Sequence, residues 1–448
     1  MPMTVAEQYL LELLNRARLD PAAEAARYGI GLNDGLAAGQ IDTTSKQVLA
    51  PNTALEAAAV GHSLWMLNYD VFSHTGAGGS QPWGRAEQQG YIGYVGENIA
   101  LNSLAGADTL ATMISVQHEA FMRSSLHRAD LMVERFGEVG LSQEQGAFTQ
   151  GGTFNVSVIT ELFGDRGALV YLTGVAYTDN DKDGFYSMGE GTRGVSFAIG
   201  RTVGSTTDTG GYGLGIKAVA AAQVTGHVGQ RTFDLTVDMA HGNVKLDVVN
   251  GNLLLTSGSV VLGAGMAQLR LLGVDGIDAT GSAIANTLTG NRGSNDLHGA
   301  GGNDILRGAA GLDRLWGDDG ADQLSGDDGN DWMAGGQGRD LLWGGLGNDR
   351  LNGGIDADAM YGQTGADAFV FQANFGSDVV QDFSLRDRDT LALDNALWGN
   401  ARLTEAQVVG RFADVIAGRV IFDFGNGEVI RLAGITTLAG LAGAIDII

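Results

Sequence analysis

The sequence predicts a multidomain protein, an α+β part followed by all-β parts, and three patterns predict it. Residues 1–165 combine helical spacing of apolar residues with an alternating strand pattern. Residues 166–258 hold short β-branched runs separated by Gly, Thr and Asp turns. Residues 259–370 end in a nine-residue repeat, and 371–448 return to a mixed apolar and acidic composition. We therefore expect four domains with these boundaries.

Glycine and acidic residues are over-represented in the chain. It contains 71 Gly among 448 residues, and 52 Asp and Glu against 27 Lys and Arg give a formal net charge of −25. An excess of this size repels nucleic acid and anionic membrane, so neither is expected as a partner. Clustered carboxylates instead favour divalent cations, which relieve their mutual repulsion.

The chain also lacks several common features. It has no cysteine, which excludes disulfides and thiolate metal sites. The start, MPMTVAEQYLLELLNRAR, has no basic segment followed by an apolar stretch, so no cleavable signal peptide is expected. No run of about 18 apolar residues occurs, so no transmembrane segment is expected. If the protein leaves the cell, its export signal lies elsewhere in the chain.

The first domain is predicted to contain helices and at least one strand. Apolar residues recur at helical spacing over Val5–Ala17, Thr53–Tyr69 and Asp108–Arg123, while Phe154–Leu162 alternates like a strand. No Gly-x-Ser-x-Gly elbow is present and cysteine is absent, so a nucleophilic hydrolase is not indicated.

Three short segments of this domain carry a family resemblance: FSHTG at 72–76, GENIA at 96–100 and SSLHR at 124–128. In this order they resemble the motifs of a bacterial CAP (SCP-like) domain, over residues 4–164. The resemblance implies an α-β-α sandwich with a cleft that holds two His and two Glu. It carries over to His74, Glu97 and His127; the second Glu does not carry over, because Ser124 stands in its place.

Two classes of function follow for this cleft. One is a module without enzymatic activity that binds an unknown extracellular ligand or protein. The other is a zinc-dependent hydrolase in which His74 and His127 are ligands and Glu97 is a base or ligand, since two His and a carboxylate leave an open zinc position. A purely structural role in a matrix is a third possibility. Whether the protein is an enzyme stays open.

A calcium loop is predicted in the second domain, which we expect to be a small β-sandwich. Residues 179–190, DNDKDGFYSMGE, fit the twelve-residue EF-hand pattern, although the flanking segments look like strands. The alternative is an acidic turn without metal. The predicted ligands are the side chains of five residues and the backbone carbonyl of Phe185: Asp179, Asp181, Asp183, Phe185, Ser187 and Glu190.

The repeat consists of nine glycine-rich nonapeptides that start at Gly290 and end with the unit at Gly362; a weaker unit begins at Gly281. The eighth position is apolar throughout, so it is expected to face inward from a short strand. Stacked glycine turns would align the sixth-position carboxylates in rows, an oxygen-only environment suited to Ca²⁺. The predicted ligands are Asp304, Asp313, Asp322, Asp331, Asp340, Asp349, Asp358 and Asp367.

This nonapeptide resembles the calcium-binding RTX (hemolysin-type) repeat. The resemblance implies a parallel β-roll with several Ca²⁺ ions between its turns; a disordered Gly/Asp-rich linker is the alternative. The tail, with FGSDVVQDF at 375–383 and DRDTL at 387–391, is similar to the β-rich C-terminal target region of type I secretion substrates. We therefore expect a secreted, extracellular protein whose partners include the type I secretion machinery.

Overall fold

The computed structural model describes residues 3–104, 109–165, 167 and 169–448. The chain divides into two compact units, Met1–Gly258 and Ser259–Ile448. The first unit contains the first two predicted domains and the second unit the other two; the finer division into four domains stays a prediction. None of the described helices is long and apolar enough to cross a membrane.

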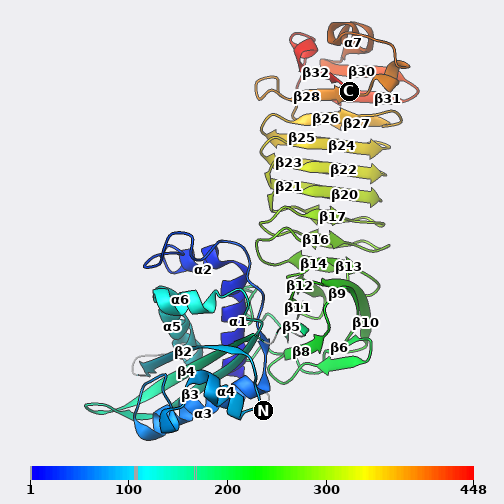
Figure 1. Ribbon diagram of the computed structural model, residues 1–448. Coiled ribbons are helices and arrows are strands. Elements are labelled where there is room, and N and C mark those ends of the chain that lie inside the picture. The colour runs from blue at the N-terminus through cyan, green and yellow to red at the C-terminus, as the bar shows by residue number, and fades with distance from the viewer. Residues whose placement is uncertain (1–2, 105–108, 166, 168) are drawn as a thin grey trace. The chain divides into compact units, whose positions relative to one another are not determined.

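The first part of unit one is an α-β-α sandwich (Figure 1). Its sheet has the order β1-β3-β4-β2, in which β1 is parallel to β3 and the other pairs are antiparallel. The predicted helices and strand are present, and some of them are extended by a few residues. The helix predicted from Asp108 begins at Leu110, and Asp108 itself lies outside the described residues. The elements are α1 (Val5–Leu19), α2 (Pro21–Arg27), β1 (Ala50–Pro51), α3 (Thr53–Tyr69), η1 (Ala77–Gly79), α4 (Pro82–Gln88), β2 (Tyr94–Ser103), α5 (Leu110–Arg123), α6 (Ser125–Leu131), β3 (Glu138–Thr149) and β4 (Thr153–Asp165).

Alternation along β4 explains why helices cover both faces of this sheet. Ile159 and Phe163 point to one face and join a core cluster with α1 and α5. Val158 and Leu162 point to the other face and pack with residues of α3. A sheet that is apolar on both faces needs a helical layer on each side. The sandwich implied by the family resemblance is therefore confirmed.

The second part of unit one is all-β, as predicted, and its strands lie in two sheets, in the orders β10-β9-β6-β7 and β12-β11-β5-β8. A fully buried ion cluster joins it to α1: the Lys245 ammonium lies 2.8 Å from the Glu12 carboxylate and also contacts Asp247. The strands are β5 (Val170–Tyr177), β6 (Ser196–Ile199), β7 (Thr202–Ser205), β8 (Gly211–Ile216), β9 (Val219–Val228), β10 (Arg231–Met239), β11 (Val244–Val249) and β12 (Leu253–Thr256).

The second unit is a parallel β-roll built from two sheets (Figure 1). From β15 to β24, strands pair in register with strands 18 residues later, as Leu297 with Leu315 and Leu306 with Leu324. The strands of the repeat region are β13 (Val260–Leu262), β14 (Gln268–Leu271), β15 (Ala279–Thr280), β16 (Thr287–Thr289), β17 (Asp296–His298), β18 (Ile305–Arg307), β19 (Ala310–Gly311), β20 (Arg314–Asp319), β21 (Gln323–Gly329), β22 (Trp332–Gln337), β23 (Leu341–Leu346), β24 (Arg350–Ile355), β25 (Ala359–Thr364) and β26 (Ala368–Phe371).

The eighth-position residues of the repeat, from Leu288 to Phe369, are all fully buried between the two sheets, as expected. Several strands are longer than the short strands expected from the repeat. From β20 onward most span six residues, because parallel pairing continues through the bend, for example between Asp318 and Gly336.

The strands of the tail continue the same two sheets. Val380 stacks on Met360 and Leu391 on Phe369, so the inward column runs past the last repeat. The nine-residue glycine period stops at 370, which hides this continuity in the sequence. The tail elements are β27 (Ser377–Val380), β28 (Thr390–Leu393), η2 (Asn395–Trp398), α7 (Glu405–Phe412), β29 (Ala413–Ile416), β30 (Arg419–Gly425), β31 (Glu428–Leu432), η3 (Leu441–Ala444) and β32 (Ile445–Ile447).

Candidate calcium sites and the N-terminal cleft

The sixth-position aspartates of the roll form two rows. In each row the backbone N–H of one aspartate donates to Oδ1 of the aspartate 18 residues later, at 2.7–2.9 Å. The first row contains Asp304, Asp322, Asp340 and Asp358, and the second contains Asp313, Asp331, Asp349 and Asp367. The orientation of each aspartate side chain is therefore fixed by the main chain of the preceding coil, that is, of the preceding 18-residue turn of the roll.

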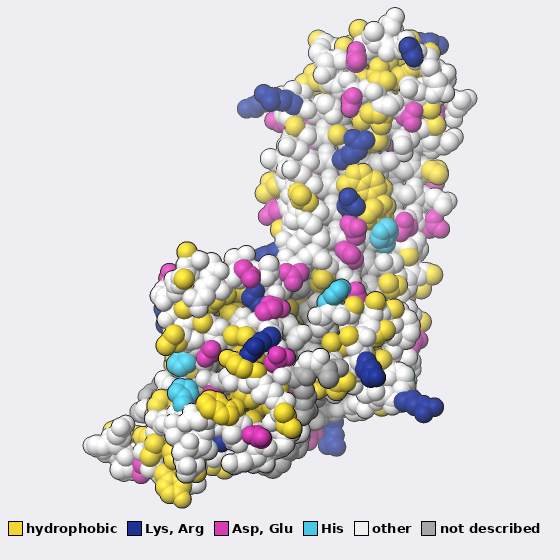
Figure 2. All heavy atoms as spheres, in the orientation of Figure 1, with side chains coloured by type: hydrophobic (Ala, Val, Ile, Leu, Met, Phe, Trp, Pro, Cys, Tyr) yellow, Lys and Arg dark blue, Asp and Glu magenta, His cyan; other side chains and the backbone are white. Residues whose placement is uncertain are grey.

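The second oxygen of every aspartate in the rows has no hydrogen-bond donor among the described residues. All eight Oδ2 atoms are buried, and each residue is at most 2% exposed. Other carboxylates do reach the surface, because Figure 2 shows scattered magenta side chains on the visible face of the roll, among white, yellow and dark blue ones. Buried oxygens that lack donors are costly unless a cation satisfies them. These residues therefore fit calcium, a cation that prefers oxygen ligands.

Backbone oxygens approach the same places. A Cβ on Gly317 would overlap both Asp322 Oδ2 and the carbonyl oxygen of Gly335. The same holds for the first glycine of most other nonapeptides. Glycine is therefore required at this position by close approach, at an ordinary negative φ. Ca²⁺ binds carboxylate and carbonyl oxygens, and both kinds lie close together here.

Burial raises the pKa of the row carboxyls, to about 6 for Asp322 and to about 7 for Asp331 and Asp340. Neighbouring carboxylates add to the rise, while the backbone hydrogen bond to Oδ1 opposes it. The ionised form is thus disfavoured in the metal-free roll. A divalent cation reverses this preference by pairing with the charge.

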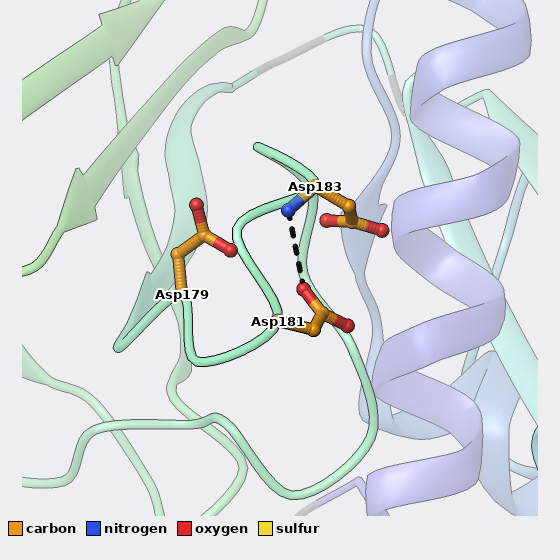
Figure 3. Close-up of side chains that lie close together, drawn as sticks. All are labelled: Asp179, Asp181 and Asp183. Carbon is orange, nitrogen blue, oxygen red and sulfur yellow. Dashed lines mark hydrogen bonds between the residues drawn. The ribbon is translucent and has the colours of Figure 1, made fainter.

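The loop at 179–190 lies between β5 and β6 and is closed by a bridge between Tyr177 and Gly191. Figure 3 shows Asp179, Asp181 and Asp183 around its first turn, with the N–H of Asp183 donating to Asp181. Ligand oxygens of these three aspartates lie within 4.8 Å of one another, and no other group of three His, Cys, Asp or Glu side chains among the described residues is gathered in this way. Asp179 Oδ1 is buried without a donor, which fits a cation.

The structure gathers three of the six predicted loop ligands, and the others have other contacts. The two oxygens of Glu190 accept from the N–H groups of Asn180 and Ser187, at 2.7 and 2.9 Å. Ser187 Oγ donates to Asp181 at 3.1 Å, and the Phe185 ring packs on α1. The predicted role of Phe185 concerns its backbone carbonyl, which stays a prediction.

The N-terminal cleft brings two of its three predicted residues into contact. His74 Nδ1 lies 2.9 Å from Glu97, and this hydrogen bond raises the pKa of His74. Arg85 forms an ion pair with the other oxygen of Glu97, which is buried. Beneath them, His62 Nε2 bonds the carbonyl oxygen of Ser73 at 2.9 Å. Arg85 is a site residue that the family motifs did not indicate.

His127 belongs to the neighbouring helix α6, and burial lowers its pKa, with a smaller effect of the same sign from His74. It does not join His74 and Glu97 in a group whose ligand atoms lie within 4.8 Å of one another. Glu119, on α5, bonds Arg123 at 2.7 Å. It therefore does not replace the missing second Glu of the family pattern.

The first row continues into the tail with an aspartate that the repeat did not predict. The N–H of Asp358 donates to Asp378 Oδ1 at 3.0 Å, and Asp378 is fully buried. The spacing is 20 residues instead of 18, so the nine-residue pattern misses it. The sequence GSD at 376–378, a fragment of the repeat motif, was the available signal.

Comparisons with known proteins bear on the roll. No curated protein matches the chain. One similar solved structure, an extracellular protein containing an SCP domain from Bacillus anthracis str. Ames, is 20% identical over 27% of this chain and 35% of that chain, with a TM-score of 0.20. The match thus spans about a third of that protein and supports no conclusion about this one. A model of the RTX calcium-binding nonapeptide repeat matches residues 280–315, 308–342 and 334–369. Residues 280–369 are therefore RTX calcium-binding repeats.

Proposed function

We propose that this chain is a secreted protein whose roll folds on Ca²⁺ after type I export, and whose N-terminal domain binds an extracellular ligand or protein. The observation that carries the calcium part is the pair of rows of buried carboxylate oxygens without donors, from Asp304 to Asp367. The aspartates of both rows and the loop residues at 179–190 are the proposed ligands.

Charge explains why folding would wait for calcium. Residues 281–370 contain 14 Asp, no Glu and 5 Arg. Where calcium is scarce, repulsion between these carboxylates favours the unfolded chain, the form that a type I exporter transports. Where calcium is abundant, the cation neutralises the rows and each closed coil offers a template for the next.

The test is a calcium titration of the full chain, started in EDTA and followed by far-UV circular dichroism. We expect β structure to increase cooperatively with Ca²⁺ and much less with Mg²⁺, which requires a tighter octahedral geometry and gives up water reluctantly. A spectrum that stays the same on calcium addition would contradict the proposal.

For the N-terminal cleft, recognition is favoured over metal catalysis. Arg85 already balances the charge of Glu97, so the cleft offers zinc a weaker carboxylate ligand than an unpaired one. The His74 side chain is half exposed above this buried ion pair, where it can contact a ligand.

The alternative is a zinc-dependent hydrolase through His74, Glu97 and His127, and contact between His74 and Glu97 is the observation in its favour. Calorimetric titration with zinc separates the two classes. Binding near one zinc per chain that is lost in His74→Ala would favour the hydrolase. Absent binding, or binding indifferent to this substitution, would favour recognition. The exposed His227 serves as a matched His→Ala control.

A further inference from the structure

The tail continues the first aspartate row by one member, Asp378. We propose that Asp358 and Asp378 hold a further Ca²⁺ beyond the nonapeptide repeats, and that this ion joins the last repeat to the tail. The inference rests on the proposed calcium binding of the rows. It adds a ligand from the segment whose sequence resembles a secretion region.

Asp378 has the features of the repeat aspartates. Its Oδ1 accepts from the N–H of Asp358 at 3.0 Å, the bond that orients each earlier aspartate of the row. The residue is 0% exposed, and within the described part of the chain neither its Oδ2 nor the buried Oδ2 of Asp358 has a hydrogen-bond donor. Two such carboxylates on consecutive coils provide the same pair of buried carboxylate oxygens that each pair within a row provides.

The tight turn of the roll also persists here despite two extra residues. Gly376 has φ +87°, and a Cβ there would overlap the carbonyl oxygen of Asp356. The neighbouring cation does not satisfy Asp378, because Arg431 bonds Ser377 Oγ instead. The charge of Arg431 acts on Asp378, but no described side chain donates a hydrogen bond to Asp378 Oδ2.

The second row ends differently, which makes the inference specific. Asp389 also accepts from the preceding coil, at 3.0 Å from the N–H of Asp367, but its Oδ2 accepts from the N–H of Ser384 at 2.8 Å. Asp382 likewise uses both oxygens for the N–H groups of Gly362 and Gln363, at 2.9 Å each. These two carboxylates are satisfied by the main chain and need no cation.

A calcium ion at Asp378 would couple the repeats to the tail. Asp378 lies in β27, which pairs with β25 of the repeats on one side and with β31 of the tail on the other. Neutralising Asp358 and Asp378 together would remove the repulsion between the last repeat and the tail strand stacked on it.

The experiment measures bound calcium per chain in the full-length protein, by equilibrium dialysis and metal analysis, for Asp378→Asn. Asparagine keeps the Oδ1 acceptor and removes the charge, and Asn286 and Asn295 already stand at sixth positions of the repeat. Asp387→Asn is the control with the same charge change, since Asp387 is exposed in the same segment. Asp331→Asn reports on the repeats themselves, and far-UV circular dichroism checks folding.

We expect Asp378→Asn to lower bound calcium by about one ion per chain, and Asp387→Asn to leave it unchanged. A loss in Asp331→Asn with no loss in Asp378→Asn would overturn this inference and leave the proposed function intact. If neither Asp331→Asn nor Asp378→Asn loses calcium, the proposed function itself fails. A loss in Asp387→Asn equal to that in Asp378→Asn would also overturn the inference, because general charge would then explain the effect.

Discussion

The first glycine of each nonapeptide keeps a small space open between a carboxylate oxygen and a carbonyl oxygen. Gly317 illustrates this, because a Cβ there would overlap Asp322 Oδ2 and the carbonyl oxygen of Gly335. We expect Gly317→Ala to weaken calcium binding at this coil and to shift the calcium midpoint of folding upward several-fold. A calcium titration followed by far-UV circular dichroism measures the midpoint.

The matched control is Gly410→Ala in helix α7, where no heavy atom lies within 4 Å of the added Cβ. Alanine in a helix is favoured over glycine by about 0.5–1 kcal/mol, so this variant should fold with an unchanged calcium midpoint. Equal midpoints in Gly317→Ala and the unmodified chain would contradict the role given to the space beside Gly317.

Residue types also explain how much of the site could be predicted. The sixth-position aspartates follow from the period alone, since register and alternation place them in rows. Asp378 could not be predicted from the period, because two inserted residues break it. The main-chain hydrogen bond to Asp378 is nevertheless kept. Arg85 could not follow either: its pairing with Glu97 depends on how α4 packs against β2, which no local pattern encodes.

At the level of elements, the loop at 179–190 is attached to helix α1. The rings of Phe185 and Tyr9 lie edge to face, with centroids 6.4 Å apart, and the Arg16 guanidinium lies 4.7 Å from the Phe185 ring centroid. Met188 packs against the same core cluster. A cation that rigidifies the loop therefore also stabilises its contact with α1.

This attachment predicts that calcium raises the Tm of the first unit. Asp181→Asn should remove most of that rise, because Asp181 is one of the three gathered carboxylates.

Phe185→Ala should lower the free energy of unfolding by about 1–2 kcal/mol, since the ring is half-buried. Calorimetry with and without calcium measures both effects. Asp208→Asn, at an exposed carboxylate, is the control of equal charge; a calcium response equal in Asp208→Asn and Asp181→Asn would contradict the assignment.

The roll as an element should respond to pH in opposite ways with and without calcium. Burial raises the pKa of Asp331, Asp340 and Asp367 to about 7, above the value of roughly 3.9 in an unfolded chain. A raised pKa in the folded state means that stability is present at low pH and is lost as the pH rises through about 7. In EDTA, the roll should therefore gain structure as the pH falls from 8 to 4.5.

With calcium present, protons compete with Ca²⁺ for the same oxygens. The calcium concentration at the midpoint of folding should therefore rise as the pH falls from 8 to 4.5. The triple variant with Asn at positions 331, 340 and 367 separates the two effects. It should be more ordered than the unmodified chain in EDTA at pH 8, and yet bind less calcium. Far-UV circular dichroism against pH measures this, and an unmodified roll equally disordered at pH 8 and 4.5 would contradict the mechanism.

At the scale of the whole molecule, the two units take their stability from different sources. The first unit has an apolar core in which helices α1 and α5 pack on the sheet, with Leu10 and Phe163 among its members. None of the aspartates of the two rows belongs to this core. The roll has one inward residue per strand over most of its length, with buried carboxylates beside it. The sequence therefore predicted the fold class of both units correctly, because the periodicity of apolar residues distinguishes helices from strands. It did not predict that the roll continues into the tail, because this depends on pairing between strands.

This contrast predicts that calcium removal unfolds the chain unevenly. In EDTA at pH 8, peptides from 281–370 should exchange their amide hydrogens rapidly, while peptides from α1 and β4 stay protected, because apolar burial there is independent of calcium. Adding Ca²⁺ should restore protection across the roll, and the same concentration of Mg²⁺ should restore little. Hydrogen–deuterium exchange with mass spectrometry resolves these segments. Equal protection of the repeats in EDTA and in calcium would show that the roll is stable with its buried carboxylates unpaired, and the calcium-driven folding mechanism would then be wrong.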